Sequence, residues 1–417
     1  MVVLVEFIST QYGDFSADLN RARLHEVCVA KDGIITGPFG SQLHKKDYVE
    51  LGTPMITVEH LGDNKIIKHN MPRIKSEDID RLSRYILRTG DIVFSRVGSV
   101  DRRTLIGSSE DGWLFSGSCL RIRPDQQKID PRFLSCFLGL PKFKEYIRKI
   151  AVGATRPSLN TSILNELNIY FPKIDEQRKI AAILSSVDAA IEQTDAIIAQ
   201  TERMKKGLMQ NLLTGKQRLP MFGDNWKMVA FEQVASIRRE KINPKVVGEL
   251  PFCIELEHIE QSSGRLISSS KTSEQSSIKS VFHQGDVLFG KLRAYLRKYW
   301  LADRDGYCST EIWPLIPNRR LIAPGFLFQL VMTDRFIDAA SITYGTHMPR
   351  TDWDVVKGHQ INLPSVPEQE AIVAILSSID KKLDEEKKYR DHLETLKNGL
   401  MQDLLTGRVR VKVDGNV

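Results

Sequence analysis

The chain has 417 residues, a length that favours two or three domains over one. Hydrophobic residues make up 41% of it, which is enough to build buried cores and excludes a wholly disordered protein. A formal net charge of +7 favours an anionic partner, although mild basicity alone is a weak indication of nucleic-acid binding.

The first ten residues are apolar but lack the basic region and the cleavage pattern of a signal peptide. No apolar run approaches the roughly 20 residues needed to cross a bilayer. The sequence therefore predicts a soluble, cytoplasmic protein. In that compartment, cysteines without a C-x-x-C pair indicate reduced, mostly buried thiols rather than disulfides or a zinc site: Cys28, Cys119, Cys136, Cys253 and Cys308.

Residues 1–175 form the first predicted globule, of mixed α and β structure. Short runs rich in β-branched and aromatic residues predict strands at 54–58, 91–95 and 120–122, and a helical stretch follows at 131–150. The second globule, residues 217–367, shows the same order, with strands at 252–256, 286–289 and 311–315 and a helical stretch at 324–340. A Gly-Asp turn begins one strand in each globule, at Gly90-Asp91 and Gly285-Asp286.

The segments that follow the two globules repeat one another. EQRKIAAILSSVDAAI, from residue 176, returns as EQEAIVAILSSIDKKL, from residue 368, and KGLMQNLLTGK returns as NGLMQDLLTGR at the same offset of 192. Between residues 176–215 and 368–407, 19 of 40 positions are identical, which chance does not produce. The chain is therefore an internal repeat of two halves.

Both repeated segments are predicted to be long helices. Their apolar residues recur at alternating steps of four and three, a 3.5-residue spacing that is typical of coiled coils. Pro172 and Pro364 precede the helices, and Gly215 and Gly407 close them. Each helix is expected to have about 37 residues and a length of roughly 55 Å. The predicted fold class is α+β, with two similar mixed domains, a pseudo-twofold repeat, and two helices paired as an antiparallel coiled coil.

Common catalytic and cofactor-binding motifs of enzymes are missing from the sequence. It has no G-x-x-x-x-G-K-[ST] phosphate loop, no G-x-G-x-x-G after a strand, and no aromatic-flanked Pro-Pro tetrapeptide of the amino-methyltransferases. His60 and His258 repeat, each after a glutamate, but repetition favours a shared structural strand over catalysis, and the other histidines lack ligand spacing. We therefore predict no catalytic residue, no metal site and no cofactor.

Basic residues recur at matching positions after the Gly-Asp strands. Arg96 and Arg102 of the first globule match Lys291 and Arg297 of the second at an offset of 195. Any one of them fits a solvated surface, but matched cations in divergent globules are better explained by a shared anionic ligand. Arg103, Arg293 and Lys298 flank these residues, and the candidate DNA-binding set also includes Lys45, Lys46 and Arg350.

A second pair of matching loops precedes the strand that leads into each long helix. Residues 153–157 and 345–349 are related by the offset of 192, and each begins with a glycine that permits close backbone approach. Arg156 and His347 lie in these loops, one position apart in the register, and join the candidate DNA-binding set. For each of these residues, an ordinary turn is slightly favoured over a DNA contact.

These features together resemble the specificity subunits of Type I restriction–modification systems. Each half is a globule with an L-P-x-x-x-E-Q-like entry into an A-I-L-S-S-[VI]-D helix that ends in L-L-T-G-[KR]. Residues 37–61, GPFGSQLHKKDYVELGTPMITVEHL, are similar to the target-recognition domains of that family. The resemblance covers essentially the whole chain, and Phe171 before Pro172 is its one departure from the usual aliphatic entry.

The resemblance implies a DNA-binding subunit without catalysis of its own. Target-recognition domains at 1–175 and 217–367 would each read one half of a bipartite DNA site. Spacer helices at 176–216 and 368–417, the latter with the C-terminal tail, would set the gap and dock two methyltransferase subunits. Translocase–endonuclease subunits would then join. Because two diverged copies replace a homodimer, the target is expected to be asymmetric.

Two functions from other classes stay open at this point. A coiled-coil adaptor that binds only protein would lack the steep salt dependence of DNA binding. A self-contained restriction enzyme would cut or methylate DNA without partners. The sequence also leaves open whether a nuclease subunit exists, because a methyltransferase complex alone would use the same subunit.

Overall fold

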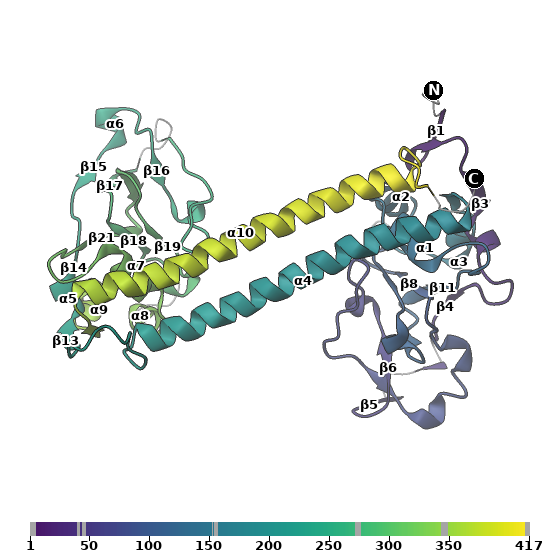
Figure 1. The fold of residues 1–417 in the computed structure, drawn as a ribbon, viewed down its shortest axis with the longest axis horizontal. Coiled ribbons are helices and arrows are strands. Elements are labelled where there is room, and N and C mark those ends of the chain that lie inside the picture. Colours follow the sequence, from purple (N-terminus) through teal and green to yellow (C-terminus); the bar gives the residue numbers. More distant parts are fainter. Residues whose placement is uncertain are drawn as a thin grey trace. The chain divides into compact units, whose positions relative to one another are not determined.

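The chain divides within its two long helices. The computed structural model describes residues 6–39, 42–43, 47–151, 153, 157–271, 277–342 and 349–412. Unit 1 comprises Met1–Thr194 and Tyr389–Val417, and unit 2 comprises Asp195–Lys388. Each unit therefore contains one globule and one end of each long helix (Figure 1).

A central antiparallel sheet organises unit 1. Its strand order is β4 (Ile34–Thr36), β11 (Cys119–Ile122), β8 (Ile92–Ser95) and β9 (Arg103–Leu105). Ile92 and Phe94 face a core built with α1 (Pro131–Phe137) and α2 (Pro141–Ile150), whereas Val93 faces an outer sheet. Because both faces are covered, β8 is buried at all four positions, which explains its continuous apolar run. The outer sheet has the order β10 (Leu114–Phe115), β6 (Thr53–Ile56), β7 (Arg73–Ile74) and β5 (Tyr48–Val49).

Unit 2 repeats the central sheet and its helical cover. The order is β14 (Ala235–Ile237), β21 (Ile312–Pro317), β18 (Val287–Gly290) and β19 (Tyr299–Leu301), with α7 (Pro324–Met332) and α8 (Asp334–Ala340) on one face. Its outer sheet has the order β15 (Lys241–Ile242), β17 (Lys279–Phe282), β20 (Gly306–Ser309) and β16 (Cys253–Ile254).

The outer sheets share one pair of strands and differ in the rest. Both contain a parallel pair, β6 with β10 in unit 1 and β16 with β20 in unit 2. In unit 1 the third strand, β7, pairs with β6. In unit 2 the third strand, β17, pairs with β20, the other member of the parallel pair. The two units thus keep one framework and diverge in the sheet that covers it.

Short elements connect these layers to the long helices. Strand β3 (Asn20–Arg23) pairs with β12 (Asn168–Phe171), and β13 (Lys227–Ala230) pairs with β22 (Gln360–Leu363). Unit 1 also has the hairpin of β1 (Phe7–Thr10) and β2 (Gly13–Ser16). The remaining short helices are α3 (Thr161–Asn165), α5 (Phe231–Val234), α6 (Pro244–Val247) and α9 (Trp353–Val356).

The predicted long helices are confirmed as α4 (Ile174–Leu212) and α10 (Val366–Leu405), of 39 and 40 residues. Each begins two residues before the predicted start, and Gly215 and Gly407 both have a φ of 74° just beyond the ends. The ion pairs Lys397–Asp188 in unit 1 (2.6 Å) and Lys205–Asp380 in unit 2 (2.5 Å) show that the helices run antiparallel. Neither these helices nor any other in the described part of the chain is long and apolar enough to cross a membrane.

Two threonines within the helix seam are buried. Thr194 and Thr201 are each only 4% exposed. The Thr194 hydroxyl donates to the Ala190 carbonyl of its own helix at 2.8 Å, so its burial leaves no donor unsatisfied. Apolar contacts between Val187, Ile191 and Leu393 form the seam in unit 1.

The prediction of one continuous helix in each globule, at 131–150 and at 324–340, was wrong. The stretch 131–150 is split into α1 and α2 because Pro141, which cannot donate a helical hydrogen bond, starts a new helix. The stretch 324–340 is split at Thr333, whose hydroxyl accepts from the Phe336 N–H and caps α8. The predicted strands 54–58 and 252–256 also end early, because each gives way to a 3-10 turn, at Val58–His60 and Leu256–His258.

Candidate nucleic-acid interface

Three loops of unit 1 meet beyond the end of β8. The N–H of Leu159 donates to the Arg96 carbonyl at 2.8 Å, and the N–H of Gly98 donates to the Pro157 carbonyl at 3.0 Å. The guanidinium of Arg96 donates to the Gly117 carbonyl at 2.9 Å and lies over the ring of Phe39, 5.7 Å from its centre. The backbone therefore joins the two loop sets that the sequence singled out separately.

Adjacent arginines in this region point to different surroundings. Arg102 is exposed and forms no ion pair with any described residue. The side chain of Arg103 is 4% exposed, donates to the Ser135 carbonyl at 2.5 Å and pairs with Asp63 at 2.7 Å. Arg102 is thus available to a ligand, whereas Arg103 holds β9 to α1.

The same two loops meet in unit 2. The N–H of Thr351 donates to the Lys291 carbonyl at 2.8 Å, and the N–H of Arg293 donates to the Pro349 carbonyl at 2.9 Å. Lys291 and Arg293 form no ion pair with described residues, whereas Arg350 pairs with Glu311 at 2.9 Å. Each unit therefore brings predicted cations to the end of its central sheet where β8 or β18 finishes.

Two further predicted cations of unit 2 have contacts within the fold. Arg297 pairs with Asp334 at 2.5 Å and donates to the Met332 carbonyl at 3.3 Å, so it connects the loop to α7 and α8. The ammonium of Lys298 donates to the Ile259 carbonyl at 2.5 Å. Both side chains are half-buried and stabilise the loop. The predicted residues Lys45, Lys46, Arg156 and His347 lie outside the described residues.

The repeated Glu-His pairs have a structural explanation. The N–H of Thr57 donates to Nδ1 of His60 at 3.1 Å, and the N–H of Glu255 donates to Nδ1 of His258 at 3.0 Å. Each histidine closes its own 3-10 turn, so the shared element is a turn rather than the predicted strand. No cluster of metal-ligating side chains occurs among the residues that the structure describes.

Comparison with known proteins identifies both units. The family described as Type I restriction modification DNA specificity domain matches residues 21–203 and 223–395, one stretch in each half. This chain belongs to that family of specificity subunits. A putative type I restriction enzyme MjaX specificity subunit of Methanocaldococcus jannaschii is 25% identical over 457 residues, covering 99% of this chain and 100% of its own. The type I restriction enzyme EcoDI specificity subunit of Escherichia coli is 26% identical and covers 62% of this chain and 65% of its own.

Solved structures share the fold. The S subunit of a Type I restriction–modification system from M. genitalium aligns with a TM-score of 0.58 at 15% identity, covering 93% of this chain and 97% of that one. A chain from a structure of complex assembly in the type I R-M system aligns with a TM-score of 0.57 at 17% identity, covering 95% and 99%. The fold of this chain, with its two globules and two long helices, is therefore shared with these solved chains.

The family's E-Q entry motif has a role that sequence reasoning missed. The buried carboxylate of Glu368 accepts from Arg218 at 2.8 and 2.9 Å, and that of Glu176 accepts from Arg410 at 2.9 and 2.6 Å. Each arginine follows the end of the other long helix, so the pair fastens the start of one helix to the end of its partner. Arg218 and Arg410 are themselves related by the offset of 192, which was a usable signal.

The glutamines next to these two glutamates also fix the starts of the long helices. The amide of Gln177 donates to the Pro172 carbonyl at 2.9 Å and accepts from the Asp130 N–H at 2.8 Å. Gln369 makes the equivalent bonds to the Pro364 carbonyl and the Ala323 N–H, at 2.9 and 2.8 Å. These bonds attach each long helix to the helical layer of its recognition domain.

The Gly-Asp turns also serve the fold. Asp91 is 1% exposed and accepts from Arg123 at 2.7 Å through both oxygens, and Asp286 is 3% exposed and accepts from Arg238 at 2.8 and 3.1 Å. The arginines follow non-equivalent strands, Arg123 after β11 and Arg238 after β14, so the sequence offset does not reveal them. These ion pairs lie at the opposite end of the central strands from the candidate interface.

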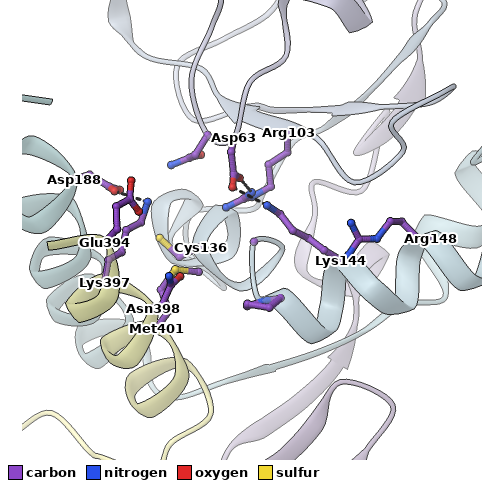
Figure 2. Close-up of a pocket in the computed structure, with 13 residues that line it drawn as sticks. Asp63, Arg103, Cys136, Lys144, Arg148, Asp188, Glu394, Lys397, Asn398 and Met401 are labelled. Carbon is purple, nitrogen blue, oxygen red and sulfur yellow. Dashed lines mark hydrogen bonds and ion pairs between the residues drawn. The ribbon is translucent and has the colours of Figure 1, made fainter. Parts of the chain in front are cut away.

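A cavity of about 240 Å³ lies in unit 1 beside the recognition domain's helices (Figure 2). Asp63 faces it and bridges Arg103 and Lys144, at 2.7 and 2.6 Å, and Lys397 pairs with Asp188 across from them. Burial would raise the pKa of Asp63, but the two cations outweigh it and the pKa is lowered. Because these charges neutralise one another, the cavity has the character of a polar interior rather than of a reactive centre.

The prediction of buried, unpaired cysteines is confirmed. All five are buried free thiols. Burial raises the pKa of Cys28 and Cys119 to about 12, and that of Cys136 and Cys253 to about 11. A thiol with such a pKa is a poor nucleophile at neutral pH.

Proposed function

We propose that this chain selects the DNA sequence on which a Type I restriction–modification complex acts. The domain of residues 1–175 reads one half of a bipartite site, and the domain of residues 217–367 reads the other. The helical segments 176–216 and 368–417 set the gap and dock two methyltransferase subunits, to which translocase–endonuclease subunits are added. The complex works in the cytoplasm, where it meets cellular DNA, and this chain needs no cofactor.

The observation that carries the proposal is the repeated pair of loops. In both units a cationic loop after the central strand is bonded to the loop that precedes the entry strand. Arg96, Arg102, Lys291 and Arg293 of these loops supply the charge that phosphates require. Sequence would then be read by side chains on loops and outer sheets that differ between the units.

A reconstituted complex tests this proposal. The chain is combined with methyltransferase subunits of its host and S-adenosylmethionine, and the methylated bases in genomic DNA are mapped. The expected result is one asymmetric bipartite sequence with a gap of fixed length. Methylation without a shared sequence would contradict the proposal, and so would methyl transfer by this chain in the absence of partner protein.

The adaptor alternative predicts a different response to salt. If the chain contributes DNA contacts, the affinity of the complex falls steeply as salt rises, by roughly 0.9 log unit per log unit of salt for each phosphate contact. A complex in which this chain binds only protein would show the slope of its methyltransferase subunits alone. Comparing the two slopes separates the functions.

A further inference from the structure

A turn in unit 2 adopts a backbone conformation that its residues disfavour. Arg293, with a φ of 54°, and Arg297, with a φ of 52°, flank the 3-10 turn Ala294–Leu296 in the left-handed region. At the offset of 195, Arg293 matches Gly98 of unit 1, whose φ is 76°. Glycine reaches this region without steric cost, whereas a residue with a Cβ atom is strained. Unit 2 thus keeps an arginine where glycine would fit the backbone better.

Contacts from three sides hold this turn in place. Ala294 is 4% exposed and packs in the core of unit 2. The N–H of Arg293 bonds to the Pro349 carbonyl, and the Arg297 guanidinium bonds to Asp334. Backbone strain that the surroundings enforce in this way is concentrated at functional sites.

The residue at the middle of the turn is an outward-facing tyrosine. Tyr295 is 53% exposed, and its hydroxyl bonds to no residue in the described part of the chain. The matching residue of unit 1, Val100, is 2% exposed and belongs to the core. The ring is therefore presented to solvent by a rigid turn in unit 2 alone. An aromatic ring held in this way loses little conformational entropy when it binds.

Basic residues lie on and next to the turn that carries this ring. Arg293 is exposed on the same turn and Lys291 lies just before it, and neither pairs with an anion among the described residues. Arg350 lies opposite Leu292 in a backbone bridge, but its guanidinium is paired with Glu311, so the charge open to a ligand is that of Lys291 and Arg293. A phosphate backbone drawn to these charges would bring the bases of a groove toward Tyr295. Cations position the duplex, whereas a side chain at a base edge distinguishes sequence.

We propose that Tyr295 is a specificity-determining residue of the second half-site. Its ring packs against the edge of one base pair, where a thymine methyl group is the apolar feature that distinguishes that pair. Arg293 holds a neighbouring phosphate, and its strained backbone fixes the direction of the ring. This inference rests on the proposed function and adds a residue that reads sequence.

The first experiment compares sequence preference. The complete methyltransferase complex is assembled with the wild-type chain, Tyr295→Ala, Tyr295→Phe or Leu321→Ala, and each methylates a library in which every position of the site is varied. Leu321 is a matched control because it is 40% exposed and follows β21, at the opposite end of the central sheet. Tyr295→Ala should lose preference at one position of the second half-site, by roughly fivefold or more, and keep the first half-site. Tyr295→Phe and Leu321→Ala should keep the whole pattern.

Failures of the two proposals look different. If the wild-type complex shows no bipartite pattern, the proposed function is wrong. If the wild type shows the pattern and Tyr295→Ala retains it unchanged, or loses preference in both half-sites equally, the inference about Tyr295 is overturned.

The second experiment tests the strained arginine. Arg293→Gly should raise the midpoint of thermal unfolding, because glycine relieves the strain, and should weaken binding to all sequences. It should also reduce the salt slope by roughly 0.9. A variant with a lower midpoint and an unchanged slope would show that Arg293 serves only the fold and would overturn its part in the inference.

Discussion

Arg102 and Arg103 are neighbours in sequence with opposite surroundings, and their substitutions should separate binding from stability. Arg102→Ala should leave unfolding unchanged, weaken the complex on all DNA sequences and reduce the salt slope by roughly 0.9, because it removes an exposed cation. Arg103→Ala should cost about 2 kcal/mol of stability, because it leaves the buried Ser135 carbonyl without this donor and removes a buried side chain. Salt-dependent binding and urea unfolding measure the two effects. Equal behaviour of the two variants would contradict this assignment.

Glu368 and Glu176 make the helix ends sensitive to single substitutions. Arg218→Ala removes both hydrogen bonds that the guanidinium gives to Glu368, whose side chain is fully buried, and should cost about 3–5 kcal/mol. Arg410→Ala should act alike on Glu176, whose side chain is 9% exposed. Arg178→Ala is the control, because its pair with Asp175 is exposed and contributes about 0.5 kcal/mol or less. Urea unfolding of the three variants tests the ranking, and a stable Arg218→Ala would refute it.

Among the elements, those with local signals were predictable and those built by distant pairing were not. The long helices follow from their own periodicity, and the buried strand β8 follows from its apolar run. Splitting of the helix at Pro141 could also have been read from the sequence, because proline begins helices readily. The outer sheets could not, since β5, β7 and β16 have two residues each and exist only through their partners.

The candidate interface shows the same limit. The offsets of 195 and 192 identified both loop sets as repeated, but only the fold joins Gly98 to Pro157 and Arg293 to Pro349. Sequence also could not separate Arg102 from Arg103, because burial of one and exposure of the other depend on how β9 meets α1. The repeat could not point to Tyr295, because the residue that matches it in unit 1, Val100, is a core residue.

The loop that begins at Gly37 should affect only the first half-site. Phe39 is 62% exposed and lies under Arg96 in unit 1. Phe39→Ala should therefore alter preference at positions of the first half-site, by up to the roughly 1–3 kcal/mol of a base contact, and spare the second. A methylated library with both half-sites varied gives the answer. A change in both halves together would contradict the division of reading between the units.

At the level of the whole chain, the repeat explains why the target should be asymmetric. Both units keep the same central sheet, helical layer and helix-end ion pairs, so the framework of the two proposed recognition domains is preserved. The outer sheets and the turn at Tyr295 have diverged. A symmetric frame with two different reading surfaces corresponds to two different half-sites separated by bases that neither unit reads.

The length of α4 and α10 should set that separation. Seven residues inserted after Thr194 and after Glu386, equivalent positions at the offset of 192, preserve the 3.5-residue seam. The insertions keep the partners Asp188 and Lys397 on one side and Lys205 and Asp380 on the other. They separate Glu202 from Lys387, an exposed pair whose loss costs about 1 kcal/mol or less.

The inserted helix adds about 10 Å at 1.5 Å per residue, which corresponds to roughly three base pairs at 3.4 Å each. The preferred gap should grow by that amount, with some loss of affinity, because each added pair rotates one half-site and the DNA must twist to compensate. The variant complex methylates a library of sites that differ only in gap length, and the products are sequenced. Insertions into only one helix serve as the control, because they shift one helix of the coiled coil against the other and should impair folding. A well-folded double insertion that prefers the original gap would mean that the helices do not set the spacing.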